Sequence, residues 1–422
     1  MNHDFDVPVL GPCQITQPPY GMYFADDGAR ILLNIIANAV PTPAAMDAPS
    51  IELAGPRRKI FFDPAKTRAA IVTCGGLCPG LNDVIRAITM VLWYRYGVRE
   101  ILGLRYGYEG MVAKSGYAPL TLNPDVVADI HKDGGTILGS SRGSQPIGDM
   151  VDFLQANHIN MLFTIGGDGT HRGANGISDE AGKRGYSLSV IGIPKTIDND
   201  IPFTDRTFGF ETAVAMSREP ITCAHREAKG VRNGVGLVKL MGRESGFVAA
   251  YASMASSDVN LVLVPEVPFT LDGVMRFLET RMIHKSHALI VVAEGAGQNM
   301  VPSQGINASG NIIFGDIGKF LRDKIETHFK TTGTPVSVKY IDPSYMIRSM
   351  PANADDSVFC FNLAANAVHA AMAGRTAMFV SHINGYFVHI PLAIAAGKRK
   401  QIDPNSELWQ SVLDNTGQPM TL

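Results

Sequence analysis

The chain has 422 residues, of which 45% are hydrophobic, and its formal net charge is −2. This length is enough for about two or three domain cores, and the balanced charge argues against nucleic acid or anionic lipid as a general partner. No apolar stretch reaches the length of a membrane span, and the acidic start Met1–Val7 lacks the basic flank of a secretory signal. Five cysteines, an odd number, form no disulfide framework, so that we expect a cytoplasmic protein that binds no membrane.

Residues 1–66 differ from the rest of the chain. They carry three proline-bearing stretches around one expected helix near residues 27–39. We interpret them as an N-terminal extension that packs on the main body or on a neighbouring subunit.

From Arg68 onward, apolar runs typical of strands alternate with helical segments. The expected strands are 69–73, 100–104, 161–165, 188–193, 236–240, 261–264, 288–293 and 337–341. Helical crossovers give parallel sheets, so we predict an α/β fold with two similar three-layer α/β domains and mainly parallel sheets. A later run, 376–391, is typical of a hairpin around Asn384 and Gly385.

The strands are too many for one small sheet, so we divide them into two units that meet at a cleft. The first comprises residues 67–206 plus 346–400 and the second 207–345, and residues 401–422 are a C-terminal tail. A helix near 209–229 leads into the second unit.

Two loops of the first unit have the residues of a phosphate site. The segment Cys74–Asn82 (CGGLCPGLN) follows the first regular strand and opens a helix, where backbone N–H groups can approach a phosphate. The loop Gly139–Gly143 (GSSRG) adds an arginine that can clamp phosphate charge. Neither loop is specific, since a tight structural turn explains the first and a solvated loop explains the second without any ligand.

The segment Gly166–Thr170 (GGDGT) follows the apolar run 161–165 and precedes a helix expected over 170–183. Its glycines therefore lie at a strand-to-helix turn, where backbone amides and the helix dipole favour a phosphate. Asp168 adds a carboxylate of the kind that binds Mg²⁺.

The segment Pro194–Asp200 (PKTIDND) follows the run 188–193, at the carboxyl end of a strand, where open α/β sheets place their ligands. Asp198 and Asp200 are two apart in an extended stretch, so both side chains can point the same way. One carboxylate can hold Mg²⁺ while the other takes a proton from an attacking hydroxyl. Together with GGDGT, this segment predicts a phosphoryl-transfer site.

Further polar residues follow strands of the second unit. Met241–Gly246 (MGRESG) comes after the strand 236–240, Glu294 ends the strand 288–293, and cations lie at Lys339 and Arg348. A carboxylate at a strand end suits sugar hydroxyls, and cations suit a sugar phosphate. The plain alternative is that these residues cap, pair or stay solvated.

In this order the segments resemble those of the 6-phosphofructokinase family, from Ala69 to about Gly397. The matching motifs are GGLCPGLN, GSSRG, GGDGT, PKTIDND, TFGFETA at 207–213, MGRESG, AEG at 293–295 and PSYMIR at 343–348. GGDGT occurs also in nicotinamide-dinucleotide kinases and diacylglycerol kinases, whereas TIDND together with MGR is specific. The resemblance implies a glycolytic, allosteric homotetramer that uses ATP and Mg²⁺ to phosphorylate fructose 6-phosphate at its 1-hydroxyl.

The resemblance also assigns roles by position. Asp198 is the general base, Thr196 and Arg243 complete the catalytic set, and Mg²⁺ is near Asp168 and Asp200. The donor nucleotide is lined by Gly75, Ser141, Arg142, Gly166, Gly167, Asp168, Gly169 and Thr170. The sugar phosphate is contacted by Thr196, Ile197, Asp198, Met241, Gly242, Arg243, Glu294, Lys339, Tyr345, Met346, Ile347 and Arg348. The first unit is thus the donor-nucleotide domain and the second the sugar-phosphate domain.

Two positions bear on the phosphoryl donor, and they disagree. Family members that use pyrophosphate carry Asp where this chain has Gly169 and Lys where it has Lys195, whereas common bacterial ATP enzymes have Gly at both. Gly169 leaves room for the α-phosphate of ATP, while Lys195 can contact a phosphate of either donor. We therefore favour ATP. The mixed pattern and the long extension are similar to the atypical ATP-dependent branch of trypanosomatids and some bacteria, which is close to the pyrophosphate-dependent group.

One departure concerns the phosphate end of the sugar. Common bacterial enzymes reach it with an arginine of a neighbouring subunit from the place where this chain has Gly234, and Lys339 is the candidate to replace that arginine.

Three alternatives to the main hypothesis are a pyrophosphate-dependent phosphofructokinase, a dinucleotide or lipid kinase sharing GGDGT, and a nucleotide-sensing subunit without turnover. The sequence contains no motif that identifies an allosteric effector or the reversibility of the reaction.

Overall fold

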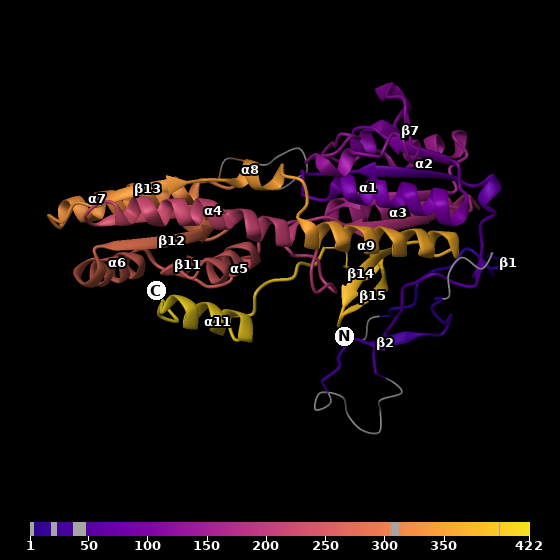
Figure 1. Cartoon of the computed structure of the whole chain (residues 1–422). Helices are drawn as coiled ribbons and strands as arrows, with labels where there is room; N and C mark the ends of the chain where they lie inside the picture. Colours follow the sequence, from indigo (N-terminus) through magenta and orange to yellow (C-terminus); the bar gives the residue numbers. More distant parts are fainter. Residues whose placement is uncertain (1–3, 18–22, 37–47, 304, 306–311, 396) are drawn as a thin grey trace. The chain divides into compact units, whose positions relative to one another are not determined.

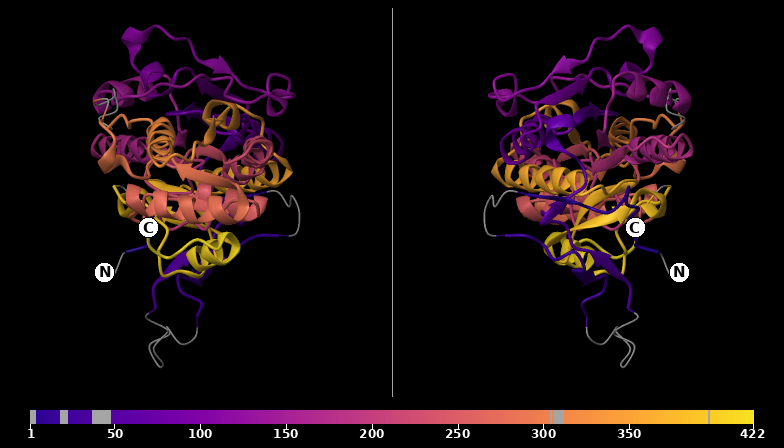
Figure 2. Two further views of the ribbon diagram at one scale, coloured as in Figure 1. Left: turned by 90° about the vertical axis from the view of Figure 1, so that its left-hand side faces the viewer. Right: turned by 90° about the vertical axis from the view of Figure 1, so that its right-hand side faces the viewer.

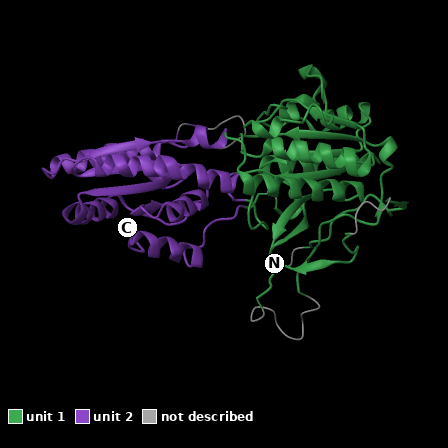
Figure 3. Ribbon diagram, in the orientation of Figure 1, with its two compact units in different colours: residues 1–196, 201–208, 350–398 green, residues 197–200, 209–349, 399–422 purple. Residues whose placement is uncertain are grey.

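The computed structural model describes residues 4–17, 23–36, 48–303, 305, 312–395 and 397–422. The chain divides into two compact units, coloured separately in Figure 3. Unit 1 comprises residues 1–196, 201–208 and 350–398, and unit 2 comprises residues 197–200, 209–349 and 399–422. The short segment with Asp198 and Asp200 therefore belongs to unit 2, although the strand before it belongs to unit 1.

Unit 1 contains a seven-stranded sheet in the order β15-β14-β9-β8-β5-β6-β7. Its strands are β5 (Arg68–Thr73), β6 (Glu100–Leu104), β7 (Leu120–Thr121), β8 (Met161–Gly166), β9 (Ser189–Pro194), β14 (Met378–Ile383) and β15 (Tyr386–Pro391). The inner pairings are parallel, and the edge strands β7 and β15 are antiparallel to their neighbours. The predicted hairpin is confirmed, with both Asn384 and Gly385 at positive φ, as a tight two-residue turn requires.

Helices cover both faces of this sheet (Figures 1 and 2). On one face α1 (Leu81–Met90) packs against α9 (Ala354–Met372), and on the other α2 (Ile147–Ala156) packs against α3 (Asp168–Lys183), with α10 (Leu392–Ala395) beside α3. Because both faces are covered, neighbouring residues such as Ile71 and Val72 of β5 are equally buried. This burial explains why the strand is a continuous apolar run rather than an alternating one.

The N-terminal extension joins unit 1 as short strand pairs. β1 (Ile15–Thr16) pairs with β4 (Lys59–Ile60), and β2 (Arg30–Leu32) pairs with β3 (Ser50–Glu52), both antiparallel. The helix expected near residues 27–39 is therefore wrong over its described part, because pairing with β3 holds residues 30–32 extended; residues 37–39 lie outside the described residues. Arg57 is 2% exposed and pairs with Glu52 at 2.9 Å, which fixes the extension from within.

Unit 2 contains a four-stranded, all-parallel sheet in the order β11-β12-β10-β13. The strands are β10 (Gly234–Leu240), β11 (Leu261–Leu263), β12 (His287–Ala293) and β13 (Ser337–Ile341). On one face lie α6 (Leu271–Lys285) and α7 (Ile317–Thr331), which share a core with alternate residues of the strands, and α4 (Phe210–Lys229) packs on α5 (Phe247–Ser256) and β10. The mixed α/β class with mostly parallel sheets, predicted from the strand rhythm, is confirmed.

Unit 2 also includes α8 (Ser344–Arg348) and the C-terminal helix α11 (Glu407–Thr416). After α11, the Gln418 side chain accepts a hydrogen bond from the Val262 N–H at 2.7 Å and donates one to the Val262 carbonyl at 3.2 Å. One amide side chain thus occupies the outer hydrogen-bonding edge of β11. Among the described residues, no helix is long and apolar enough to cross a membrane.

Candidate active site

The two loops of unit 1 that carry Gly75 and Ser141 lie against each other. Gly75 has φ +87° and its N–H donates to the Ser141 carbonyl at 3.0 Å, while the Ser140 hydroxyl donates to the Gly75 carbonyl at 2.7 Å. Gly75 and Ser141, both expected at the donor, are therefore neighbours, and Arg142 is exposed beside them.

The GGDGT segment forms the predicted strand-to-helix turn between β8 and α3, and Gly167 caps the helix. The N–H groups of Thr170 and His171 both donate to the Gly167 carbonyl, at 2.9 and 3.0 Å. Within the described residues, the N–H groups of Asp168 and Gly169 have no acceptor, as is usual in the first turn of a helix. They are available to an anion such as a phosphate.

Gly166 and Gly169 differ in whether the fold leaves space for a side chain. A Cβ on Gly166 would lie 2.1 Å from Oγ1 of Thr170, so this position has no space for a side chain. A Cβ on Gly169 would meet nothing nearer than an Arg172 nitrogen at 4.0 Å. The fold therefore does not require a glycine at position 169. Open space of this kind is expected where a ligand binds.

Tyr108 supports this turn from the core of unit 1. Its role was not predicted from the sequence. It is buried in a short 3-10 helix, Gly107–Met111, and its hydroxyl donates to the Thr170 carbonyl at 2.7 Å. Its ring also fills the space beside Gly173, where a Cβ would be 2.6 Å away. Nothing local in the sequence pairs position 108 with 170.

Lys195 connects the PKTIDND segment to the first glycine loop. It is 6% exposed, its Nζ donates to the Gly76 carbonyl at 2.5 Å, and its N–H donates to the Gly166 carbonyl at 3.0 Å. Next to it, the Thr196 carbonyl accepts a hydrogen bond from the Thr207 hydroxyl at 2.6 Å. The position that bears on donor choice is therefore also a structural link within unit 1.

Of the two carboxylates expected near Mg²⁺, Asp168 has the more suitable surroundings. Its side chain is 25% exposed at the start of α3, with Arg172 at 3.3 Å and the Gly397 N–H at 3.0 Å. Asp200 is 9% exposed and its carboxylate lies 2.6 Å from Arg399. No group of three His, Cys, Asp or Glu side chains in the described chain is arranged to hold a metal.

In unit 2, Asp198 is held at both ends by the MGRESG turn. Its carbonyl accepts a hydrogen bond from the buried Ser245 hydroxyl at 3.0 Å, and its carboxylate accepts one from the Arg243 backbone. Burial, followed by the nearby carboxylates of Asp200 and Glu294, raises the pKa of Asp198 to about 7. A carboxylate with such a pKa is suited to accept a proton near neutral pH.

The MGRESG turn and the end of β12 are close-packed backbone. Gly242 has φ +129°, and a Cβ on Gly295 would lie 1.8 Å from the Arg243 carbonyl oxygen. Arg243 donates to the Ile312 carbonyl at 2.6 Å and lies over the Phe314 ring. Glu294, at the carboxyl end of β12, is close enough to Asp198 to act on its pKa. Met241, Gly242, Arg243, Glu294 and Asp198 are therefore brought together.

The remaining expected sugar-phosphate residues lie on β13 and α8. Tyr345 and Met346 are exposed, and the Arg348 guanidinium lies over the Tyr345 ring at 4.5 Å. Ile347 is only 2% exposed, so its side chain is a core residue. Lys339 is half-buried on β13 beside Gly236.

Gly234 begins β10, and a Cβ there would lie 2.1 Å from the Ala228 carbonyl oxygen. The backbone of α4 thus approaches too closely for any side chain. A glycine at position 234 therefore has a steric basis in this fold.

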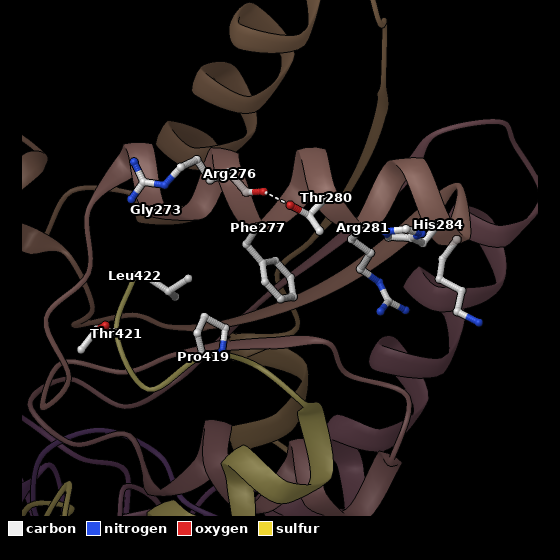
Figure 4. Close-up of a pocket in the computed structure, with 10 residues that line it drawn as sticks. Gly273, Arg276, Phe277, Thr280, Arg281, His284, Pro419, Thr421 and Leu422 are labelled. Atoms are coloured by element: carbon white, nitrogen blue, oxygen red, sulfur yellow. Dashed lines mark hydrogen bonds between the residues drawn. The ribbon is translucent and has the colours of Figure 1, made fainter.

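A separate hollow of about 470 Å³ lies on unit 2 between α6 and residues 419–422 (Figure 4). Phe277 and Pro419 line it, together with basic residues that include Arg281 and Lys285. None of the residues expected from the sequence lines this hollow.

A helix start with unpaired N–H groups and a buried carboxylate at strand ends of α/β units are features expected of a phosphoryl-transfer enzyme. The Phosphofructokinase family pattern matches residues 68–371. The chain is 46% identical to an ATP-dependent 6-phosphofructokinase of Borreliella burgdorferi, over 100% of this chain and 98% of that protein. It is 47% identical to an ATP-dependent 6-phosphofructokinase of Trypanosoma brucei brucei, over 89% of this chain and 78% of that protein. The chain therefore belongs to the phosphofructokinase family.

The fold has the same relatives. A crystal structure of pyrophosphate-dependent phosphofructokinase from Nitrosospira multiformis matches with a TM-score of 0.69 and 19% identity, over 82% of this chain and 91% of that chain. At this identity the likeness concerns the fold, and it agrees with the α/β architecture described above.

Proposed function

We propose that the chain transfers the γ-phosphoryl group of ATP to the 1-hydroxyl of D-fructose 6-phosphate and so forms fructose 1,6-bisphosphate in glycolysis. The observation that carries the proposal is the arrangement around Asp198: its backbone carbonyl accepts a hydrogen bond from Ser245, and its carboxylate accepts one from the Arg243 backbone and would accept the hydroxyl proton. Family membership and the matching motifs supply the substrate class.

The roles divide between the two units. Unit 1 would bind the donor through the free N–H groups of Asp168 and Gly169, with Arg142 available to the phosphates. Unit 2 would bind the sugar phosphate and supply the base. Positioning and charge stabilisation dominate phosphoryl transfer, so no covalent intermediate with the protein is needed.

Mg²⁺, when bound, neutralises charge on the donor phosphates. Asp168 is the residue that would hold it, because its carboxylate is partly exposed at the first turn of α3, next to the N–H groups that would bind phosphate.

ATP is the proposed donor for a steric reason. The space beside Gly169 is open, and an Asp there would place a carboxylate where donor phosphates approach. The two relatives named above carry ATP in their names. Pyrophosphate remains the alternative because Lys195 is present.

The test is a comparison of ATP and pyrophosphate at saturating fructose 6-phosphate with purified protein, repeated with Gly169→Asp. We expect Mg²⁺-dependent turnover with ATP, and a loss of at least about tenfold in kcat/KM for ATP in the variant, equivalent to about 1.4 kcal/mol. Turnover with pyrophosphate alone would replace ATP by the alternative donor, and no turnover with either, despite nucleotide binding, would favour a sensing subunit.

We further infer a cytoplasmic homotetramer under allosteric control. The family resemblance supports the assembly, and light scattering on the purified protein measures it. A mass of one or two chains would contradict the tetramer.

A further inference from the structure

Residues 399–402, here called the return segment, make one contact after another with the loop that carries Asp198 and with the MGRESG turn. All of these residues belong to unit 2. The sequence pattern assigned this part of the chain to the end of a domain and to a tail, without a role.

The first contact is ionic. Arg399 lies between two carboxylates, with Nη1 at 2.6 Å from Asp200 Oδ2 and Nε at 3.0 Å from Glu244 Oε2. A guanidinium presents donors in a fixed plane and can therefore bridge two acids, which a lysine ammonium on a flexible stem does less well.

The next three residues, 400–402, each donate a further hydrogen bond. The Lys400 N–H donates to the Asp200 carbonyl at 2.8 Å, and the Gln401 side chain donates to the Glu244 carbonyl at 3.0 Å. The Ile402 N–H donates to Glu266 Oε1 at 3.0 Å, and the same oxygen accepts the Gly246 N–H at 2.9 Å. Glu266 thus fastens the return segment to the end of the MGRESG turn.

These bonds fix the loop on either side of the base. Asp200 is held by Arg399 and Lys400, and the Asp198 carbonyl is held by Ser245 of the turn that Arg399, Gln401 and Glu266 fasten. The carboxylate of Asp200 is nearly buried and engaged in this pairing.

We propose that Arg399 is a positioning residue for phosphoryl transfer, which sets the place of Asp198 by clamping Asp200 to Glu244, and that Asp200 serves as the anchor of the loop. This inference rests on the proposed function, because it assigns Asp198 the role of the base. A base displaced by about 1 Å can cost on the order of 10²-fold in rate.

The test compares Arg399→Met, Arg399→Lys, Glu244→Gln and the double variant Arg399→Met with Glu244→Gln. Arg322→Met is the control, since Arg322 pairs with the exposed Asp323 at 2.7 Å on α7. For Arg399→Met we expect kcat to fall by about 10- to 100-fold with the KM for ATP within about twofold. Arg399→Lys should regain part of kcat. The double variant should lose less than the two single variants combined, because both changes break the same bridge between Arg399 and Glu244.

Hydrogen exchange of residues 197–200 is the readout that needs no turnover. Faster exchange in Arg399→Met than in the control supports the clamp even if the wild-type protein fails to phosphorylate fructose 6-phosphate, in which case the proposed function alone is wrong. Unchanged exchange overturns the clamp. A kcat within twofold of wild type, with only the melting temperature lowered, overturns the positioning role. If Arg399→Met does not fold, Arg399→Lys and Glu244→Gln decide by the same two criteria.

Discussion

The hydroxyl of Tyr108 donates a hydrogen bond to the carbonyl of Thr170 at 2.7 Å, from inside the core of unit 1. This bond joins a 3-10 helix to the first turn of α3, whose free N–H groups are the proposed phosphate site. Tyr108→Phe should lower the free energy of unfolding by about 1 kcal/mol, because one buried hydrogen bond is lost, and should weaken ATP binding through the loosened turn. Urea unfolding and an ATP titration measure both effects.

Tyr94→Phe is the matched control for that change, since Tyr94 is 60% exposed. Equal stability of the two variants would contradict the supporting role of Tyr108.

Alanine at two of the three glycines of the GGDGT turn, Gly166 and Gly169, should have opposite consequences for folding. Gly166→Ala drives a methyl into Thr170 at 2.1 Å and should cost about 1–3 kcal/mol. Gly169→Ala enters open space in a helix, where Ala is preferred over Gly, and should leave stability within about 0.5 kcal/mol or raise it. Thermal unfolding of both proteins provides the comparison, and a destabilised Gly169→Ala would show that position 169 is packed.

Asp198→Asn keeps the size of the side chain and removes the proton acceptor. We expect kcat to fall by at least about 10²-fold, as is usual when a general base is lost, with the circular dichroism spectrum unchanged. Asp125→Asn, at an exposed site, serves as the control. Near-normal turnover of Asp198→Asn would remove Asp198 from the mechanism.

The stability of unit 1 should depend on acid through His369. Burial lowers the pKa of His369 to about 3, and Tyr96 lies 2.8 Å from its Nδ1. The unfolded chain therefore binds a proton below pH 6.5 that the folded chain does not, so stability falls as the pH drops from about 6.5 towards 3. At pH 5 the expected loss from this group is about 2 kcal/mol.

His369→Gln should flatten the dependence of the melting temperature on pH between 7 and 5, whatever its effect at pH 7. His284→Gln, at an exposed position on α6, should leave the slope unchanged. Parallel curves for wild type and His369→Gln would show that folding does not lower the pKa of His369.

Local patterns were sufficient for much of the fold. Continuous apolar runs predicted the parallel strands because both faces of each sheet are covered, and the Asn384 and Gly385 pair predicted the hairpin from backbone conformation alone. The expected helix near residues 27–39 failed because pairing between β2 and β3 depends on residues outside the local pattern.

The candidate site divides in the same way. GGDGT and PKTIDND are each an unbroken stretch of sequence that directly follows a strand. Their positions at strand ends were therefore predictable from the sequence. Tyr108, Glu266 and Arg399 act on these segments from distant parts of the chain, and no spacing rule connects position 399 with 200 or 244. Glu244 belongs to the recognised MGRESG motif, whereas its ion-pair partner Arg399 belongs to no motif that was recognised.

The last strands of the larger sheet have a consequence for synthesis. β9 ends at Pro194, yet its parallel neighbour β14 begins at Met378, after the whole sheet of unit 2 has been translated. While the ribosome is still making residues 209–349, the nascent first unit has an apolar strand edge without its native partner. Such long-range pairing is slow and leaves intermediates prone to aggregation. We therefore expect premature stop codons before residue 378 to yield insoluble protein, and chaperones to engage the chain mainly during that interval.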